Sequence, residues 1–66
     1  MDDYIERLKV LRERRGLSQS EVAAILGTTQ QVYSRYEQRI NELPIRHLIT
    51  LCRYYGVSAD HILGLK

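Results

Sequence analysis

The 66-residue chain lacks the features that mark secreted, membrane-spanning and disulfide-linked proteins. It has one cysteine, Cys52, so no internal disulfide can form and the fold must rest on packing or on a partner chain. The longest apolar run, residues 22–26, is far shorter than the roughly 20 residues that cross a bilayer. Because no apolar stretch follows the Met1-Asp2-Asp3 start, we expect no secretory signal and a location in the cytoplasm.

A strong charge of one sign is also missing. The net charge is +2, from 10 Lys+Arg and 8 Asp+Glu, which by itself barely favours nucleic acid as a partner. Eight of the ten cationic residues are arginine, whose side chain suits planar, bidentate recognition. The length allows one domain, residues 1–66, because a second would leave neither half a core. A chain of this size buries only about 60% of the surface that its unfolded form exposes, so its stability should be marginal.

Signals for β-strands are absent, so we expect an all-α fold. Proline occurs once, and β-branched residues never alternate with polar residues over the length of a strand. Apolar spacing, cap residues and four glycines predict a compact bundle of five short helices. The helices should span residues 3–15, 19–26, 30–38, 44–55 and 59–63. The expected N-terminal caps are Asp2 or Asp3, Ser18, Thr29 and Ser58, with Pro44 as the first residue of the fourth helix.

Helical periodicity predicts which side chains face the core. The residues expected inside are Tyr4, Leu8, Leu11, Val22, Ala23, Leu26, Tyr33, Tyr36, Ile45, Leu48, Ile49, Cys52 and Tyr55. His47 and His61 are expected at the surface. One cysteine and two distant histidines do not resemble a metal site, and no glycine-rich phosphate loop occurs. We therefore expect no metal, no cofactor and no enzymatic activity.

The junction between the second and third helices is the most informative segment. Two helices joined by only Gly27-Thr28 cannot lie antiparallel and must cross steeply. A steep crossing needs a small residue where the backbones approach, and Ala23 provides it. Tyr33 and Tyr36 have the spacing of anchors that face back toward the core. This geometry predicts a helix-turn-helix over about residues 18–38, whose second helix enters the DNA major groove.

The outward side of the third helix carries side chains that can read base edges. It presents Gln30, Gln31, Ser34 and Arg35, with Val32 at its border. Glutamine can bond adenine N6 and N7, arginine can bond guanine O6 and N7, and valine can pack on a thymine methyl. From the residue pattern alone, a merely solvated surface is an equal alternative.

Three segments of the chain read Leu17-Ser18-Gln19-x-Glu21-Val22-Ala23-x-x-Leu26-Gly27, then Ser34-Arg35-Tyr36-Glu37, then Leu48 to Gly56-Val57-Ser58. They resemble the Cro/C1-type helix-turn-helix family of lambdoid phage repressors, Cro proteins and small bacterial (XRE-type) regulators. The resemblance implies a lambda repressor-like domain that binds a double-stranded DNA operator sequence-specifically and represses transcription.

The same resemblance assigns roles to individual residues. It implies base contacts by Gln30, Gln31 and Arg35, and a structural ion pair between Arg12 and Glu37. We expect phosphate contacts at Gln19, Thr29, Gln38, Arg39 and Asn41. Thr28 departs from the family's usual valine, and Arg39 from its usual glycine, so the route of the 39–43 loop stays open.

The size of the domain bears on its assembly and its partners. One such domain buries too little surface for tight specific binding, so we expect either a weak homodimer or dimerisation on DNA, in each case through Tyr54, His61 and Leu65. Two alternatives remain: an antitoxin whose main partner is a toxin protein, and a protein-interaction module that has kept the fold. The sequence contains no feature that separates an antitoxin from a plain regulator.

Overall fold

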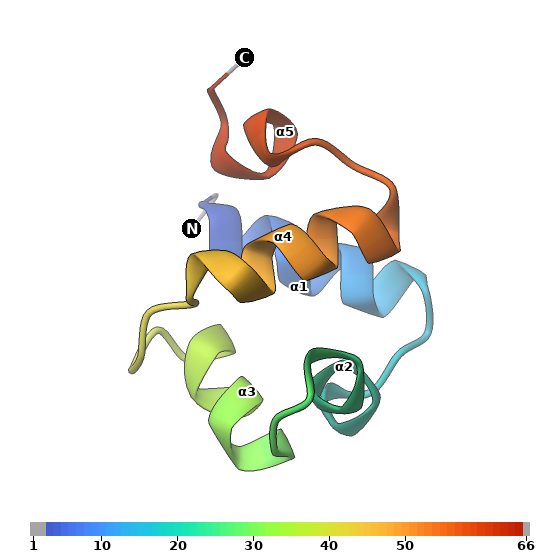
Figure 1. The fold of residues 1–66 in the computed structure, drawn as a ribbon, viewed down its shortest axis with the longest axis vertical. Coiled ribbons are helices and arrows are strands. Elements are labelled where there is room, and N and C mark those ends of the chain that lie inside the picture. Colours follow the sequence, from blue (N-terminus) through green and yellow to red (C-terminus); the bar gives the residue numbers. More distant parts are fainter. Residues whose placement is uncertain (1–2, 66) are drawn as a thin grey trace.

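The computed structural model describes residues 3–65 and contains five α-helices, with no strand among these residues (Figure 1). The helices are α1 (Tyr4–Arg14), α2 (Gln19–Leu26), α3 (Gln30–Glu37), α4 (Ile45–Tyr55) and α5 (Ala59–Leu63). The expected all-α fold is confirmed, and each expected boundary lies within one residue of the observed one. None of these helices has the length and apolar character needed to span a membrane.

Side-chain caps set most of the helix starts. The Asp3 carboxylate accepts from the Glu6 amide and so begins α1, whereas Asp2, the other candidate, lies outside the described residues. Ser18 and Glu21 form the reciprocal capping box expected at α2. The expectation that Pro44 is the first helical residue is wrong, because its ψ of 149° is extended and makes it the N-cap, the residue before the helix.

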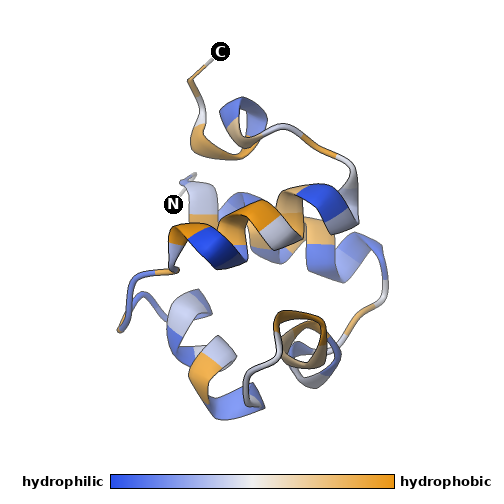
Figure 2. Cartoon of the chain, in the orientation of Figure 1, coloured by the Kyte–Doolittle hydropathy of each residue, from blue (hydrophilic) through white to orange (hydrophobic). Residues whose placement is uncertain are grey.

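Every helix contributes to one core. Its buried residues are Leu8, Val22, Ala23, Tyr33, Tyr36, Leu51, Tyr55 and Ile62. α2 packs against α3 and α4, α1 packs against α3 and α5, and α5 also packs against α4. Figure 2 shows α2 as largely apolar, whereas α3 is hydrophilic apart from one apolar segment. The polar outer side of α3 therefore remains available for a partner.

The inner face of α4 is rotated from the expected one. Ile45 and Ile49 were expected inside but are exposed, Ile45 to 75%, while His47, expected at the surface, is only 8% exposed. The buried stripe consists of His47, Leu51 and Tyr55, spaced four residues apart. The His47 ring lies against Tyr36, with ring centroids 6.0 Å apart. This contact with α3 selects a stripe that includes a histidine over one that includes two isoleucines.

Smaller differences concern the other inner faces. Ile5, which was not expected inside, is buried together with Leu8. Tyr4, Leu11 and Leu26 are partly buried and pack against the edge of the core. Cys52 is likewise partly buried against the core and carries a free thiol, whose pKa is raised by burial.

Candidate nucleic-acid interface

The turn between α2 and α3 has the geometry of a steep helix crossing. α2 ends at Gly27, whose φ of 71° is left-handed, and the Thr28 amide donates to the Ala23 carbonyl at 2.9 Å. The Thr29 hydroxyl then accepts from the Val32 amide and starts α3. In Figure 1, α2 is seen nearly end-on and α3 from the side. Ala23 is fully buried beside this turn.

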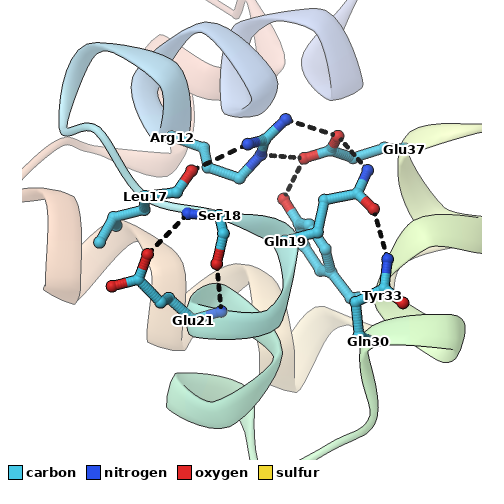
Figure 3. A network of polar contacts seen from close by, with 8 residues as sticks. All are labelled: Arg12, Leu17, Ser18, Gln19, Glu21, Gln30, Tyr33 and Glu37. Carbon is cyan, nitrogen blue, oxygen red and sulfur yellow. Dashed lines mark hydrogen bonds and ion pairs between the residues drawn. The ribbon is translucent and has the colours of Figure 1, made fainter.

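A buried ion pair joins α1 to the end of α3. Arg12 Nε donates to Glu37 Oε2 at 2.7 Å and Nη2 donates to Oε1 at 3.1 Å, while Nη1 donates to the Leu17 carbonyl (Figure 3). The side chains are only 12% and 6% exposed. Glu37 also accepts from the Tyr33 hydroxyl at 2.6 Å and from Gln19 Nε2 at 3.0 Å. The ion pair expected from the family resemblance is thus present, and it lies inside a larger network.

The network keeps Glu37 ionised and Tyr33 protonated. Burial raises the pKa of Glu37, but the hydrogen bonds from Arg12, Tyr33 and Gln19 outweigh it, so the net pKa lies below the ordinary value. Burial, together with the bond to Glu37, holds the pKa of Tyr33 far above its ordinary value. The hydrogen bond to Glu37 raises the pKa of Arg12. Removal of either charged side chain would leave the other charge buried without a partner.

Gln19 connects this network to the outer face of α3. An ionised carboxylate only accepts hydrogen bonds, so Gln19 must donate one from its Nε2 to Glu37. Its oxygen then accepts from Gln30 Nε2 at 2.8 Å (Figure 3). This series of hydrogen bonds, which runs from Arg12 through Glu37 and Gln19 to Gln30, sets the orientation of the Gln19 and Gln30 side-chain amides. The exposed Gln30 side chain is therefore hydrogen-bonded to α2 at the start of α3.

Four of the five expected base-contact residues, all except Val32, line one groove on the outward side of α3. The groove measures about 290 Å³ and is lined by Gln30, Gln31, Ser34, Arg35, Gln38 and Ile40. Gln38 donates to the Ser34 hydroxyl at 3.0 Å. Val32 is not among the lining residues and packs partly against the core. Arg35 is exposed, and no ion pair engages it among residues 3–65.

The chain reverses direction just beyond this groove. Arg39 has a φ of 64°, the left-handed conformation that glycine adopts most easily. Its guanidinium forms two hydrogen bonds with the Asp3 carboxylate, at 2.9 and 2.8 Å. The amides of Ile40 and Asn41 both point back to the Arg35 carbonyl. The route of the 39–43 loop, which the sequence left open, thus starts as a turn folded back on α3.

Two features of the site had no signal in the sequence. Ile40 borders the polar groove although it is apolar and 65% exposed, and no sequence pattern pointed to it. The pair between Asp3 and Arg39 spans 36 residues, so neither spacing nor periodicity could reveal it.

The surface expected to form a dimer is exposed. Tyr54, His61 and Leu65 are all exposed, and so is the apolar Leu63. Tyr54 stacks edge-on against the buried Tyr55, with ring centroids 5.5 Å apart. Within residues 3–65, no three His, Cys, Asp or Glu side chains lie close enough to hold a metal ion.

Comparisons with known proteins agree with this architecture. The helix-turn-helix family matches residues 8–62. Over 62 residues, the chain is 37% identical to the uncharacterized HTH-type transcriptional regulator YobD of Bacillus subtilis (strain 168), covering 94% of this chain and 55% of YobD. It is 41% identical over 58 residues to the SPbeta prophage-derived uncharacterized HTH-type transcriptional regulator YonR of the same organism, covering 88% of this chain and 54% of YonR.

The chain thus spans about half the length of these two relatives. No solved structure matches it significantly. The family match covers the helix-turn-helix and most of α1, α4 and α5, and both relatives named above are called transcriptional regulators. The chain therefore belongs to the Cro/C1-type helix-turn-helix family, a family of regulators and not of enzymes.

Proposed function

We propose that this domain binds a double-stranded DNA operator sequence-specifically, with α3 in the major groove, and acts as a transcriptional repressor. One observation carries the proposal: the groove on α3 gathers two glutamines, a serine and an unpaired arginine, and no acidic side chain lines it. A face that reads bases needs such donors and acceptors and must not repel phosphate. The names of YobD and YonR, both HTH-type transcriptional regulators, support the same role.

The base contacts follow from the chemistry of the groove. Gln30 and Gln31, at the start of α3, suit adenine, to which an amide can bond at N6 and N7. Arg35, one turn beyond Gln31, suits guanine O6 and N7. Ser34 joins them, although its hydroxyl already accepts from Gln38. Val32, at the border of the face, would meet a thymine methyl.

The phosphate contacts flank these residues. Helix N-termini attract phosphate because their free amides and dipole favour an anion, and Gln19 and Thr29 stand at the starts of α2 and α3. Gln38, Arg39 and Asn41 are exposed where α3 ends. Contacts on both sides would fix the register of α3 without reading sequence.

A homodimer would supply the surface that one domain lacks. Specific protein–DNA interfaces usually bury about 1,000–2,500 Å² of protein surface, and dimers bind half-sites one helical turn, about 34 Å, apart. The exposed apolar side chains at the end of α4 and in and after α5, among them Tyr54 and Leu65, offer a surface for a second copy.

Selection of binding sites from random duplex DNA tests this function. We expect enrichment of a two-fold symmetric motif, and footprinting that shows two protected half-sites about 34 Å apart. Footprints of a single half-site at saturating protein would contradict the homodimer. A protein that enriches no motif would contradict sequence-specific binding and favour a protein-interaction module.

A further inference from the structure

The N-terminal cap of α1 engages the first arginine after the candidate recognition helix. Arg39 Nε donates to Asp3 Oδ2 at 2.9 Å, and Nη2 donates to Oδ1 at 2.8 Å. Asp3 Oδ1 also accepts from the Glu6 amide, so one carboxylate both starts α1 and binds the arginine. The edge of the guanidinium that is formed by Nε and Nη2 is therefore occupied in the free protein.

Arg39 lies beside the groove that we propose to meet DNA. Gln38 and Ile40, its two neighbours in the chain, both line the groove on the outward face of α3. The backbone at Arg39 is fixed, because φ is 64° and the next amide donates to the Arg35 carbonyl at 3.0 Å. The side chain thus starts beside the groove and turns away from it toward α1.

We propose that Asp3 competes with DNA phosphate for Arg39 and thereby lowers the affinity of the domain for all duplexes alike. This inference rests on the proposed function. The Asp3 carboxylate bonds the edge formed by Nε and Nη2, one of the two edges that a guanidinium offers for bidentate contact with phosphate, and this edge cannot bond both anions at once. The Asp3 charge itself also repels a phosphate that approaches Arg39.

The exchange is accessible because the pair is open to solvent. The Arg39 and Asp3 side chains are 40% and 30% exposed, unlike the Arg12–Glu37 pair. Exposed ion pairs are weak, so a phosphate can displace the carboxylate. When Arg39 binds a phosphate, its ion pair with Asp3 is broken, and this lowers the affinity for DNA whatever the base sequence.

A four-protein cycle tests the competition: the wild type, Asp3→Asn, Arg39→Gly and the double variant. Asparagine keeps a good N-cap for α1 and removes only the charge. Glycine adopts a positive φ without strain, so the turn is preserved. Binding is measured on the preferred duplex and on an unrelated duplex at several salt concentrations. Glu13→Gln, which removes an exposed carboxylate at the other end of α1, controls for net charge.

We expect Asp3→Asn to raise affinity about two- to five-fold on both duplexes at low salt. The slope of log affinity against log salt should steepen by about one unit, a change that a purely structural role for Asp3 would not cause. The gain should vanish in the Arg39→Gly background and should exceed that of Glu13→Gln. Asp3→Ser also keeps a cap and should give the same gain in affinity, which would show that the gain does not depend on the asparagine side chain.

Unchanged or weaker binding by both Asp3 variants, with the wild type still selective, would overturn the competition alone. Weaker binding would show instead that Asp3 presents Arg39 to the DNA. A wild-type protein with no preferred duplex would overturn the proposed function together with this inference.

Discussion

Tyr33 donates a 2.6 Å hydrogen bond from its hydroxyl to Glu37 Oε2, one turn further along α3. The same carboxylate accepts two bonds from Arg12 and one from Gln19, which in turn holds Gln30. The inner side of α3 is thus fixed by charged hydrogen bonds, while its outer side carries the proposed base contacts. Stability and recognition are connected through this one carboxylate.

Two tyrosine substitutions should have opposite effects. Tyr33→Phe removes a hydrogen bond to a charged group and should lower the free energy of unfolding by about 1.5–3 kcal/mol. The Tyr55 hydroxyl is buried without a partner among residues 3–65, and burial raises its pKa to about 12. Tyr55→Phe should therefore leave stability unchanged or raise it by about 1 kcal/mol. Urea denaturation of both variants checks this, and equal losses would contradict the hydrogen-bond assignments.

Glu37 should make the domain sensitive to acid. Its pKa in the fold lies below the ordinary value of 4.5, so the unfolded chain binds more protons in this range and stability rises with pH. The contribution is complete above about pH 4.5 and is lost as the pH falls through the folded pKa. Glu37→Gln should cost about 3 kcal/mol at pH 7, because Arg12 is left unpaired, and should flatten the acid limb. An unchanged acid limb in denaturation curves from pH 3 to 7 would refute the assignment.

His47 should make the stability of the domain depend on pH at a less acidic pH than Glu37 does. Burial, with a contribution from Arg46, lowers its pKa below the ordinary 6.5. Below pH 6.5 the unfolded chain binds more protons, so stability should decline as the pH falls from 6.5 toward the folded pKa. His47→Leu should remove this part of the pH dependence, whereas the same change at the exposed His61 should not. If the two variants gave identical pH profiles, His47 would not titrate as a buried group.

Ala23 should tolerate no larger side chain. Ala23→Leu would overpack the contact at the α2–α3 turn and should cost about 1–3 kcal/mol, much of the stability of so small a domain. Its neighbour Ala24 is exposed, so Ala24→Leu is a matched control that should leave the melting temperature nearly unchanged. Equal melting temperatures for the two variants would show that Ala23 does not lie at the helix crossing.

Local signals explain why the helices could be predicted. The capping box at Ser18 and Glu21, the Thr29 cap and the left-handed Gly27 each act within four residues, and all are present in the structure. The short turn between α2 and α3 follows from them. This is the part of the fold that defines the family, which is why the resemblance rested mainly on it.

The face of α4 could not be chosen from its own sequence. Two stripes share Leu48 and Tyr55: one adds Ile45 and Ile49, and the other adds Leu51 together with a histidine. Hydrophobicity favours the first, but the packing of α4 against α3 and α5 selects the second. Only tertiary contacts decide between stripes that differ by less than a turn.

Side-chain contacts between distant segments were likewise beyond the sequence. The pairs Asp3–Arg39 and Gln19–Gln30 depend on how helices are placed relative to one another. Arg39 was expected to contact phosphate, which stays a prediction, and in the free protein its side chain is paired with a carboxylate. A pair between residues so far apart in the chain depends on how the end of α3 is placed beside the start of α1.

The central claim is that the outer face of α3 reads bases, and Arg35→Ala tests it most directly. Binding should be measured at several salt concentrations on the selected duplex and on duplexes changed at each base pair, with the exposed Arg53→Ala on α4 as a control for lost charge. We expect Arg35→Ala to lose about 1–3 kcal/mol on the selected duplex and to relax preference at one base-pair position, with unrelated duplexes affected less. Equal loss on every duplex would contradict the account, because Arg35 would then bind phosphate rather than a base.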